Sequence, residues 1–389
     1  MKTIKLGELC DINPKDALPD KGTLVSFIPM QRVSETGQVD ATETRQSEEV
    51  TKGFSSFREG DILMAKITPC MENGKGGIAK GLCNGIGYGS TEFHVIRPTS
   101  PLVRTEWIYY YTTYPRFRKL CEQNMTGSAG QKRVPKSYLL GCPIPVPNLN
   151  TQDKVIHSLR SLRSIIEHRR AQLAKLDELV KCRFVEMFGD CRSNPKQWGT
   201  KKLDEIASVG SSKRVFVEEL IDGGIPFYRG TEVGALAEGQ NITPELFISE
   251  SHYRELCKAS GKPVKGDLLM PSICPDGRIW IVDSDSPFYF KDGRVLWVHD
   301  IHENFNPIFL QYSLKDRIIS DYASIASGTT FAELKIFTLK SCKIFDVPLP
   351  LQDSFAIFVR HIDKLRISVQ AALEKAQTLF DSLMQEYFG

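Results

Sequence analysis

The chain has 389 residues and a mass of 43.8 kDa, which predicts two or three domains, each able to bury its own core. Apolar residues make up 41% and charged residues 25%, a composition that excludes a disordered or fibrous protein, and a formal charge of +3 gives no sign of a strongly basic nucleic-acid domain. No apolar run reaches the ~18 residues of a membrane span or forms the ~7–15-residue block of a signal peptide, so we expect a cytoplasmic protein without membrane contact.

The two halves of the chain resemble each other, with equivalent segments about 200 residues apart. Near the start of each half, a short apolar segment at Lys5–Leu9 matches one at Lys202–Ile206. A Gly-Asp turn followed by an apolar strand then occurs at Glu59–Met64 and again at Lys265–Met270. The order of these signals predicts a duplicated domain in which short helices accompany a twisted β-sheet.

Each half ends its globular part with a small-residue loop and a proline-rich exit. The loops are Gly127–Gly130 and Ser327–Thr330, and the exits are Pro143–Pro147 and Val347–Pro350. Prolines at every second position exclude a helix and a central strand, so both exits are predicted to be extended linkers.

A long helix is predicted after each exit, over Gln152–Phe188 and Gln352–Phe388, because neither stretch contains proline or glycine and a glycine follows each. At ~1.5 Å per residue, each helix would be roughly 55 Å long. Apolar residues recur in steps of three and four, which is typical of a heptad seam, so we expect the two helices to pack against each other. The predicted seam residues are Leu159, Leu162, Ile166, Leu173, Leu176, Val180, Ile362, Leu365, Val369, Ala372, Ala376, Leu379 and Leu383.

These signals divide the chain into four parts. We expect a first globular domain at 1–150, a first spacer helix at 151–189, a second globular domain at 190–350 and a second spacer helix at 351–389. The predicted fold class is α+β, with two globular domains built on twisted sheets, two long helices between them and an internal pseudo-two-fold repeat.

No catalytic or cofactor motif stands out in the sequence. The glycine patterns of phosphate and dinucleotide sites are absent, and the ten cysteines form no Cys-x-x-Cys pair, which indicates reduced, buried thiols. His299 and His302 have no third ligand at metal-binding spacing, so no metal site is predicted. Asp276, Glu333 and Lys335 have the residue types of a metal-dependent nuclease, but the other half has no counterpart, which favours coincidence.

The order of globular domain, proline exit and long helix, given twice, resembles the specificity subunit of type I restriction-modification enzymes over essentially the whole chain. The marks of this resemblance are a Leu-Gly-Glu start, the Gly-Asp strand, the small-residue loop before Ile-Pro-Val-Pro, and Gln152 and Gln352. The sequence departs from the family at Thr151 and Leu351, where glutamate often precedes the glutamine. The resemblance implies two target recognition domains on an antiparallel coiled coil, which together read a bipartite, asymmetric DNA site.

The same resemblance implies the partners of the chain. These are double-stranded DNA, two modification subunits that methylate adenine and two restriction subunits that cleave DNA. S-adenosylmethionine, ATP and Mg are then expected in the partner subunits, with no cofactor and no catalysis in this chain. The assembled complex would act as a site-specific DNA methyltransferase and an ATP-dependent endonuclease.

Charge is divided unevenly between the two predicted domains. Residues 1–150 hold 19 basic and 15 acidic side chains, whereas residues 191–350 hold 19 and 21. Phosphate contact in the second domain must therefore come from a local patch. The residues predicted to bind DNA, chosen in or beside loops, are Lys66, Lys75, Lys80, Gln131, Lys132, Arg133, Lys136, Lys213, Arg214, Arg229, Arg278, Lys291 and Arg294.

The sequence leaves two other interpretations open. A single-chain DNA-modifying enzyme would cleave or methylate DNA without partners when supplied with Mg²⁺ and S-adenosylmethionine. A coiled-coil interaction scaffold would show no sequence-selective DNA binding even with a modification subunit present.

Overall fold

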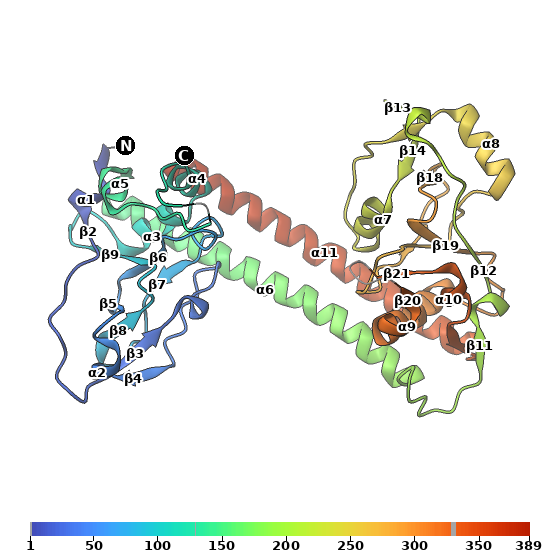
Figure 1. Ribbon diagram of the computed structural model, residues 1–389, viewed down its shortest axis with the longest axis horizontal. Coiled ribbons are helices and arrows are strands. Elements are labelled where there is room, and N and C mark those ends of the chain that lie inside the picture. The colour runs from blue at the N-terminus through green and yellow to red at the C-terminus, as the bar shows by residue number, and fades with distance from the viewer. Residues whose placement is uncertain (1, 129, 328–331) are drawn as a thin grey trace. The chain divides into compact units, whose positions relative to one another are not determined.

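The computed structural model describes residues 2–128, 130–327 and 332–389, and the chain forms two compact units. The first unit comprises Met1–Arg170 and Gln370–Gly389, and the second comprises Ala171–Val369. Each unit therefore combines one globular segment with an end of each long helix, as the colours of the ribbon in Figure 1 show.

The first unit contains two four-stranded sheets and a short ribbon. Its elements are β1 (Lys2–Lys5), α1 (Leu6–Leu9), β2 (Cys10–Ile12), β3 (Leu24–Ile28), η1 (Met30–Arg32), β4 (Thr44–Gln46), α2 (Ser47–Val50), β5 (Ser55–Arg58), β6 (Ile62–Ala65), β7 (Gly76–Ile78), η2 (Cys83–Gly85), β8 (Ile86–Gly89), β9 (Phe93–Pro98), α3 (Thr105–Thr113), α4 (Pro115–Gln123), α5 (Lys136–Gly141) and β10 (Pro143–Val146). The antiparallel sheet has the order β2-β9-β6-β7, and the mixed sheet has the order β4-β3-β8-β5 with β3 and β8 parallel. The ribbon joins β1 to β10, the proline-rich exit.

The second unit repeats this plan. Its elements are β11 (Thr200–Lys202), η3 (Leu203–Glu205), β12 (Ser208–Gly210), η4 (Val217–Glu219), β13 (Leu220–Ile221), β14 (Ile225–Tyr228), α7 (Gly230–Ala237), β15 (Phe247–Ile248), α8 (Glu250–Ser260), β16 (Leu268–Pro271), β17 (Trp280–Ile281), β18 (Tyr289–Phe290), β19 (Val295–His299), α9 (Pro307–Ile325), β20 (Ala326–Ser327), β21 (Glu333–Leu334), α10 (Ile336–Lys340) and β22 (Lys343–Phe345). The sheet β12-β19-β16-β17 matches β2-β9-β6-β7, and the mixed sheet β13-β15-β14-β18 again has one parallel pair, β14 with β18. The predicted duplicated α+β fold is thus confirmed.

The Gly-Asp signal marks the same strand in both units. Gly60 and Gly266 have φ values of +87° and +98°, a backbone conformation that glycine adopts without a steric penalty. The strands that follow, β6 and β16, are buried at all four positions, in agreement with their continuous apolar sequence.

The long helices are α6 (Leu149–Phe188) and α11 (Leu349–Phe388), each of 40 residues. Both begin three residues before the predicted start. In α11 this places Pro350 in the first turn, where proline is tolerated because its missing N–H has no helical partner. No helix among the described residues is long and apolar enough to cross a membrane.

Within each unit, opposite ends of the two long helices pack together, so α6 and α11 run antiparallel. In the first unit, Leu159 near the start of α6 shares a core with Phe388 at the end of α11. In the second unit, Phe184 and Phe188 at the end of α6 pack against Phe355 near the start of α11, with ring centroids 5.4 and 5.5 Å apart.

The predicted seam residues are buried to different extents in the two helices. All six predicted residues of α6 are buried or half-buried, as are five of α11, but Leu365 and Leu379 are 54% and 57% exposed. Their neighbours Arg366 and Phe380 are half-buried instead. Arg366 fills a seam position because its Nη2 donates to Asp177 Oδ1 at 2.5 Å, so counting apolar residues selected the wrong neighbour.

A buried glutamine anchors the start of α6. Gln152 is fully buried, and its side-chain carbonyl accepts the backbone N–H of Arg104, the residue before α3, at 2.9 Å. Its side-chain amide donates to the carbonyls of Leu102 and Pro147, both at 2.8 Å. The proline-rich exit, the segment leading into α3 and the long helix are thereby held at one point.

The same three bonds recur at the start of α11. Gln352 is also fully buried and accepts the N–H of Asn306, the residue before α9, at 2.9 Å. It donates to the carbonyls of Asn304 at 3.1 Å and Val347 at 2.7 Å. The internal repeat therefore extends to individual side-chain hydrogen bonds.

We expect Gln152→Leu to destabilise the first unit, because the Arg104 N–H and the Leu102 and Pro147 carbonyls lose the amide that binds them. Each lost hydrogen bond costs about 0.5–1.5 kcal/mol, so the free energy of unfolding should fall by about 2–4 kcal/mol. Denaturant unfolding, with hydrogen exchange at β1 and β10 to locate the loss, measures this effect. The exposed Gln370→Leu is the control, and equal unfolding midpoints for the two variants would contradict the anchor.

Candidate nucleic-acid interface

Two of the predicted basic residues, Arg133 and Lys66, lie beside Glu92 in the first unit, and two more lie close to Arg133 in the chain. Arg133 donates from Nε and Nη2 to the two carboxylate oxygens of Glu92 at 2.9 and 2.8 Å. Lys66 is held beside them, since its backbone N–H donates to the Glu92 carbonyl at 2.9 Å. Lys132 and Lys136 flank Arg133 in the chain and are exposed. The group Lys66, Lys132, Arg133 and Lys136 is called the basic cluster below.

The basic cluster carries net positive charge. Hydrogen bonding from Arg133, assisted by the nearby charge of Lys66, lowers the pKa of Glu92, so its carboxylate stays ionised and balances one cation. Within the described part of the chain, no carboxylate lies within 4.0 Å of the amino groups of Lys66, Lys132 or Lys136. Unpaired cations beside an exposed loop are suited to contact phosphates.

The other predicted residues of the first unit have different surroundings. Gln131 is exposed next to the basic cluster. Lys75 lies on the adjoining segment, where its carbonyl accepts the Ala65 N–H at 2.9 Å. Lys80 instead pairs with Glu106 at 3.6 Å, and Glu106 also binds Arg160 of α6 at 2.8 Å. Lys80 therefore takes part in the ion pairs that link α3 to α6.

In the second unit, all four predicted arginines are paired with carboxylates. Desolvation alone would raise the pKa of Glu232, but hydrogen bonds from Arg229 and Thr231 hold it at about 2. The exposed lysines Lys213 and Lys291 have no carboxylate partner among the residues described. The arginine pairs are Arg214 with Asp292 at 3.5 Å, Arg229 with Glu232 and with Glu245 at 2.9 Å, Arg278 with Asp276 at 2.8 Å, and Arg294 with Glu333.

These carboxylate partners are not evident from the sequence. Only Glu232 lies near its arginine at helical spacing, in the first turn of α7. The predicted small-residue loops cannot be placed in full, because Ala129 and residues 328–331 lie outside the described residues.

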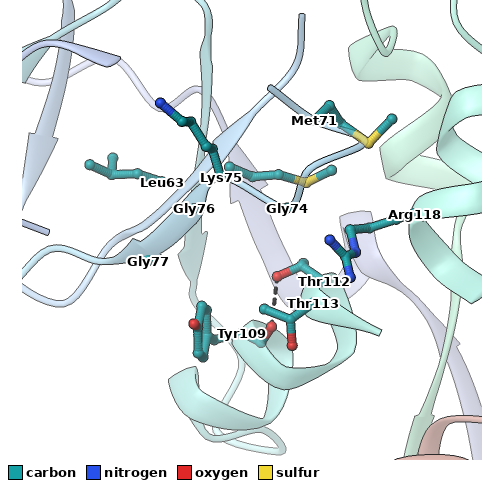
Figure 2. Close-up of a pocket in the computed structure, with 11 residues that line it drawn as sticks. Leu63, Met71, Gly74, Lys75, Gly76, Gly77, Tyr109, Thr112, Thr113 and Arg118 are labelled. Carbon is teal, nitrogen blue, oxygen red and sulfur yellow. Dashed lines mark hydrogen bonds between the residues drawn. The ribbon is translucent and has the colours of Figure 1, made fainter. Parts of the chain in front are cut away.

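A small hollow between β6, β7 and the helices α3 and α4 is occupied by structural contacts. Figure 2 shows the Arg118 guanidinium directed toward Thr112, with Lys75 extending away. Arg118 Nη1 donates to the Glu72 carbonyl at 3.4 Å, and a Cβ on Gly74 would lie 2.1 Å from that nitrogen. The glycine therefore makes room for the arginine, whose pKa is lowered by desolvation.

A polar groove beside β4 was missed by the sequence analysis. Arg32, which lines the groove, donates to Glu43 at 3.0 Å and also pairs with Asp40. Amides, guanidinium and carboxylate groups are the side chains that hydrogen-bond base edges, so this groove is a second surface suited to DNA. No spacing signal marks these residues, which lie between strands. The groove is lined by Gln31, Arg32, Ser34, Gln38, Asp40 and Glu43.

A buried histidine supports the segment that carries the basic cluster. His94 is 3% exposed, its Nε2 lies 2.7 Å from the Val134 carbonyl, and its Nδ1 lies 3.1 Å from the Asn13 side-chain amide. Desolvation lowers the pKa of this imidazole, so it is neutral at pH 7. Within the described residues, no group of three or more His, Cys, Asp or Glu side chains is placed to hold a metal ion.

Comparison with known proteins gives a consistent result. A family model described as the type I restriction modification DNA specificity domain matches residues 1–177 and 195–376. The specificity subunits of the type I restriction enzymes EcoAI and EcoEI from Escherichia coli are 42% and 41% identical over 176 and 177 residues. These matches cover 44% and 45% of this chain and 30% of each relative, so the match spans under a third of either relative's length.

The fold is also similar to that of a solved structure. The crystal structure of the type I restriction-modification system S subunit from M. genitalium has a TM-score of 0.60 and 15% sequence identity. The similarity covers 100% of this chain and 96% of that chain. At this identity, the comparison supports the architecture of the whole chain.

We expect the first unit to lose stability as the pH falls below 6.5, the ordinary pKa of histidine. Below that value the unfolded chain binds a proton at His94 that the folded chain does not bind, so the free energy of unfolding decreases until the pH reaches the lowered folded pKa. Urea unfolding between pH 5 and 8 measures this loss. His94→Asn should flatten the dependence and His302→Asn should not, whereas an unchanged slope in His94→Asn would contradict the assignment.

Proposed function

Because the chain belongs to the family of type I restriction modification DNA specificity domains, we propose that it is the DNA-recognition subunit of a type I restriction-modification enzyme. One observation carries the proposal: the family model matches both halves of the duplicated fold. Two specificity domains in one chain would read two short half-sites, and hence a bipartite DNA sequence.

The two half-sites are expected to differ, because the same backbone carries different side chains in the two units. The first unit presents the basic cluster with three unpaired lysines, whereas the second presents Lys213 and Lys291 beside paired arginines. Each bidentate contact to a base supplies about 1–3 kcal/mol of discrimination, and contacts in two domains of one chain roughly add. The target is therefore asymmetric.

The long helices would act as a ruler between the two half-sites. A helix of 40 residues extends ~60 Å, whereas one turn of duplex DNA measures ~34 Å. Two domains on such a pair of helices can contact one face of the duplex about a turn apart. Base pairs between the half-sites would then be spanned without being read.

Catalysis would belong to partner subunits that dock on this chain. We propose two modification subunits, which use S-adenosylmethionine to methylate adenine, and two restriction subunits, which use ATP and Mg to cleave DNA. Both long helices expose large apolar side chains, which a docked partner would remove from water. With DNA as its target, the chain would act in the cytoplasm. The exposed apolar residues of the two helices are Ile165, Leu179, Val185, Ile357, Leu365, Ile367 and Leu379.

Three arginines of the long helices are engaged within the chain itself. Arg160 binds Glu106, and Arg163 donates from Nη1 to the Tyr109 hydroxyl at 3.0 Å. Arg366 is held by Asp177. These guanidinium groups stabilise the chain itself, so the exposed apolar residues are the better candidates for a partner surface.

Selection from a library of random duplexes tests the proposal directly. The purified chain, with modification subunits and S-adenosylmethionine present, should retain DNA that shares two short motifs at a fixed spacing. Retention without sequence preference would contradict the proposal and favour the interaction scaffold. Methylation or cleavage by the chain without partners would favour the single-chain enzyme.

Shortening both helices by one heptad should shorten the spacer and leave the half-sites unchanged. Deleting Arg170–Leu176 and Ile367–Leu373 removes seven residues from each helix and keeps Arg366 opposite Asp177. The helices lose ~10 Å, equivalent to about three base pairs at ~3.4 Å each. The same library selection measures the spacer.

The matched control keeps both helices at full length. It substitutes the exposed Lys175 and Gln370, which lie in the two deleted segments, by serine. This control should retain the original spacer, and an original spacer in the deletion variant would contradict the ruler.

A further inference from the structure

In the first unit, backbone hydrogen bonds join three segments beside the basic cluster. The Lys66 N–H donates to the Glu92 carbonyl and the Val134 N–H donates to the Lys66 carbonyl, both at 2.9 Å. Glu92 lies directly before β9, and Arg133 directly before Val134. The side chains of Glu92 and Arg133 therefore meet above the end of β6.

The second unit contains the same backbone path. The Ser272 N–H donates to the Arg294 carbonyl at 2.9 Å, and the Leu334 N–H donates to the Ser272 carbonyl at 2.7 Å. Arg294 lies directly before β19, and Glu333 directly before Leu334. The two units can thus be aligned residue by residue at this place.

This alignment pairs opposite charges at equivalent positions. Glu92 corresponds to Arg294, and Arg133 corresponds to Glu333. In the first unit the arginine follows the loop and donates two hydrogen bonds back to the glutamate before β9. In the second unit the arginine precedes β19 and donates to the glutamate after the loop, which Lys335 also contacts at 3.0 Å. Both units therefore contain the ion pair, but the arginine and the glutamate have exchanged positions.

The reversal separates two roles that an arginine beside a DNA-facing loop could have. A phosphate ligand requires positive charge at the contact, whereas Glu333 puts a carboxylate where Arg133 stands. A link between the two positions requires only opposite charges, and it does not matter which position carries the arginine and which the glutamate. Both units retain the link.

We propose that Arg133–Glu92 and Arg294–Glu333 are positioning pairs, which fasten the residue before Val134 to the start of β9 and the residue before Leu334 to the start of β19, and leave phosphate contact to neighbouring lysines. In the first unit these are Lys66, Lys132 and Lys136. The inference rests on the proposed function in DNA recognition, and it assigns to Arg133 and Arg294 a role different from the phosphate contact expected from the sequence.

The exposure of the two pairs agrees with a local role. The Arg133 and Glu92 side chains are 39% and 26% exposed, and those of Arg294 and Glu333 are 57% and 21% exposed. Ion pairs at such sites contribute little to global stability. The two-pronged contact between the Arg133 guanidinium and the Glu92 carboxylate nevertheless fixes direction, which is what a segment that must meet DNA in one orientation requires.

The test compares Arg133→Gln, which breaks the first pair, with Glu92→Arg/Arg133→Glu, which reverses it and keeps the net charge. Binding is measured in complex with the modification subunits, on duplexes that differ only in the first half-site, over a series of salt concentrations. Arg133→Gln should weaken binding about tenfold without changing the salt dependence, and the reversed pair should restore binding to within about threefold of the original.

Lys132→Gln is the matched control, and it should reduce the slope of binding against salt by about 1, as loss of one phosphate contact does. If the reversed pair stays as weak as Arg133→Gln and has a reduced slope as well, Arg133 is a phosphate ligand and the inference is wrong.

Hydrogen exchange in the DNA-free chain separates this inference from the proposed function. The N–H groups of Thr126 and Arg133 bond to each other's carbonyls across the loop at 2.9 and 2.8 Å. Both should lose protection in Arg133→Gln and regain it in the reversed pair, with the unfolding midpoint unchanged. Full protection in Arg133→Gln would overturn the positioning role, whereas absence of selective DNA binding by the original chain would overturn the proposed function alone.

Discussion

A buried side-chain amide determines where each long helix begins. Gln152 and Gln352 each use one acceptor and two donors to join the exit strand, the segment before α3 or α9 and the first turns of α6 or α11. A carboxylate of the same size could not donate and an aliphatic chain could do neither, so the chemistry of the primary amide is required. At the far ends of the helices, Phe388 packs against Trp107 with ring centroids 4.5 Å apart, and Phe188 packs against Phe309 at 4.8 Å.

The two units combine a common frame with different side chains. Asp61 and Asp267 occupy the same turn, and each accepts the backbone N–H three residues earlier, at 2.7 and 2.9 Å. Beyond that shared bond they diverge, because Asp61 binds the guanidinium of Arg97 whereas Asp267 accepts the indole N–H of Trp297. The backbone bonds that hold strands and turns are kept, and side chains vary around them. A recognition protein needs this combination, since two half-sites can be read differently only if the frame tolerates changes in the groups that it presents.

The sequence predicts the helices, the buried strands and the internal repeat well, but it predicts the partners of individual side chains poorly, for physical reasons. Prolines in the exits, glycines before β6 and β16 and uninterrupted helical stretches act locally, so the repeat, the buried strands and the two long helices follow from them. The seam of α11 was ambiguous because apolar residues favoured Leu365 and Leu379, and only the position of Asp177 makes Arg366 the inner residue. The arginines predicted to bind DNA are a second example of a partner that the local sequence does not show. Glu92 lies 41 residues from Arg133 and Glu333 lies 39 residues from Arg294, so no local pattern reveals that these cations are already paired.

The distribution of the long helices between the two units has a consequence for synthesis of the chain. The core of the first unit includes Met384 and Phe388, so the residues that close it are translated more than 200 residues after Trp107, against which they pack. Such distant contacts slow folding, because a large loop must close before they form. The second unit draws all of its core from 171–369 and can complete itself first. While the ribosome finishes the chain, the aromatic surface around Trp107 and Tyr110 is therefore open to solvent, and we expect this nascent intermediate to be the species that chaperones bind.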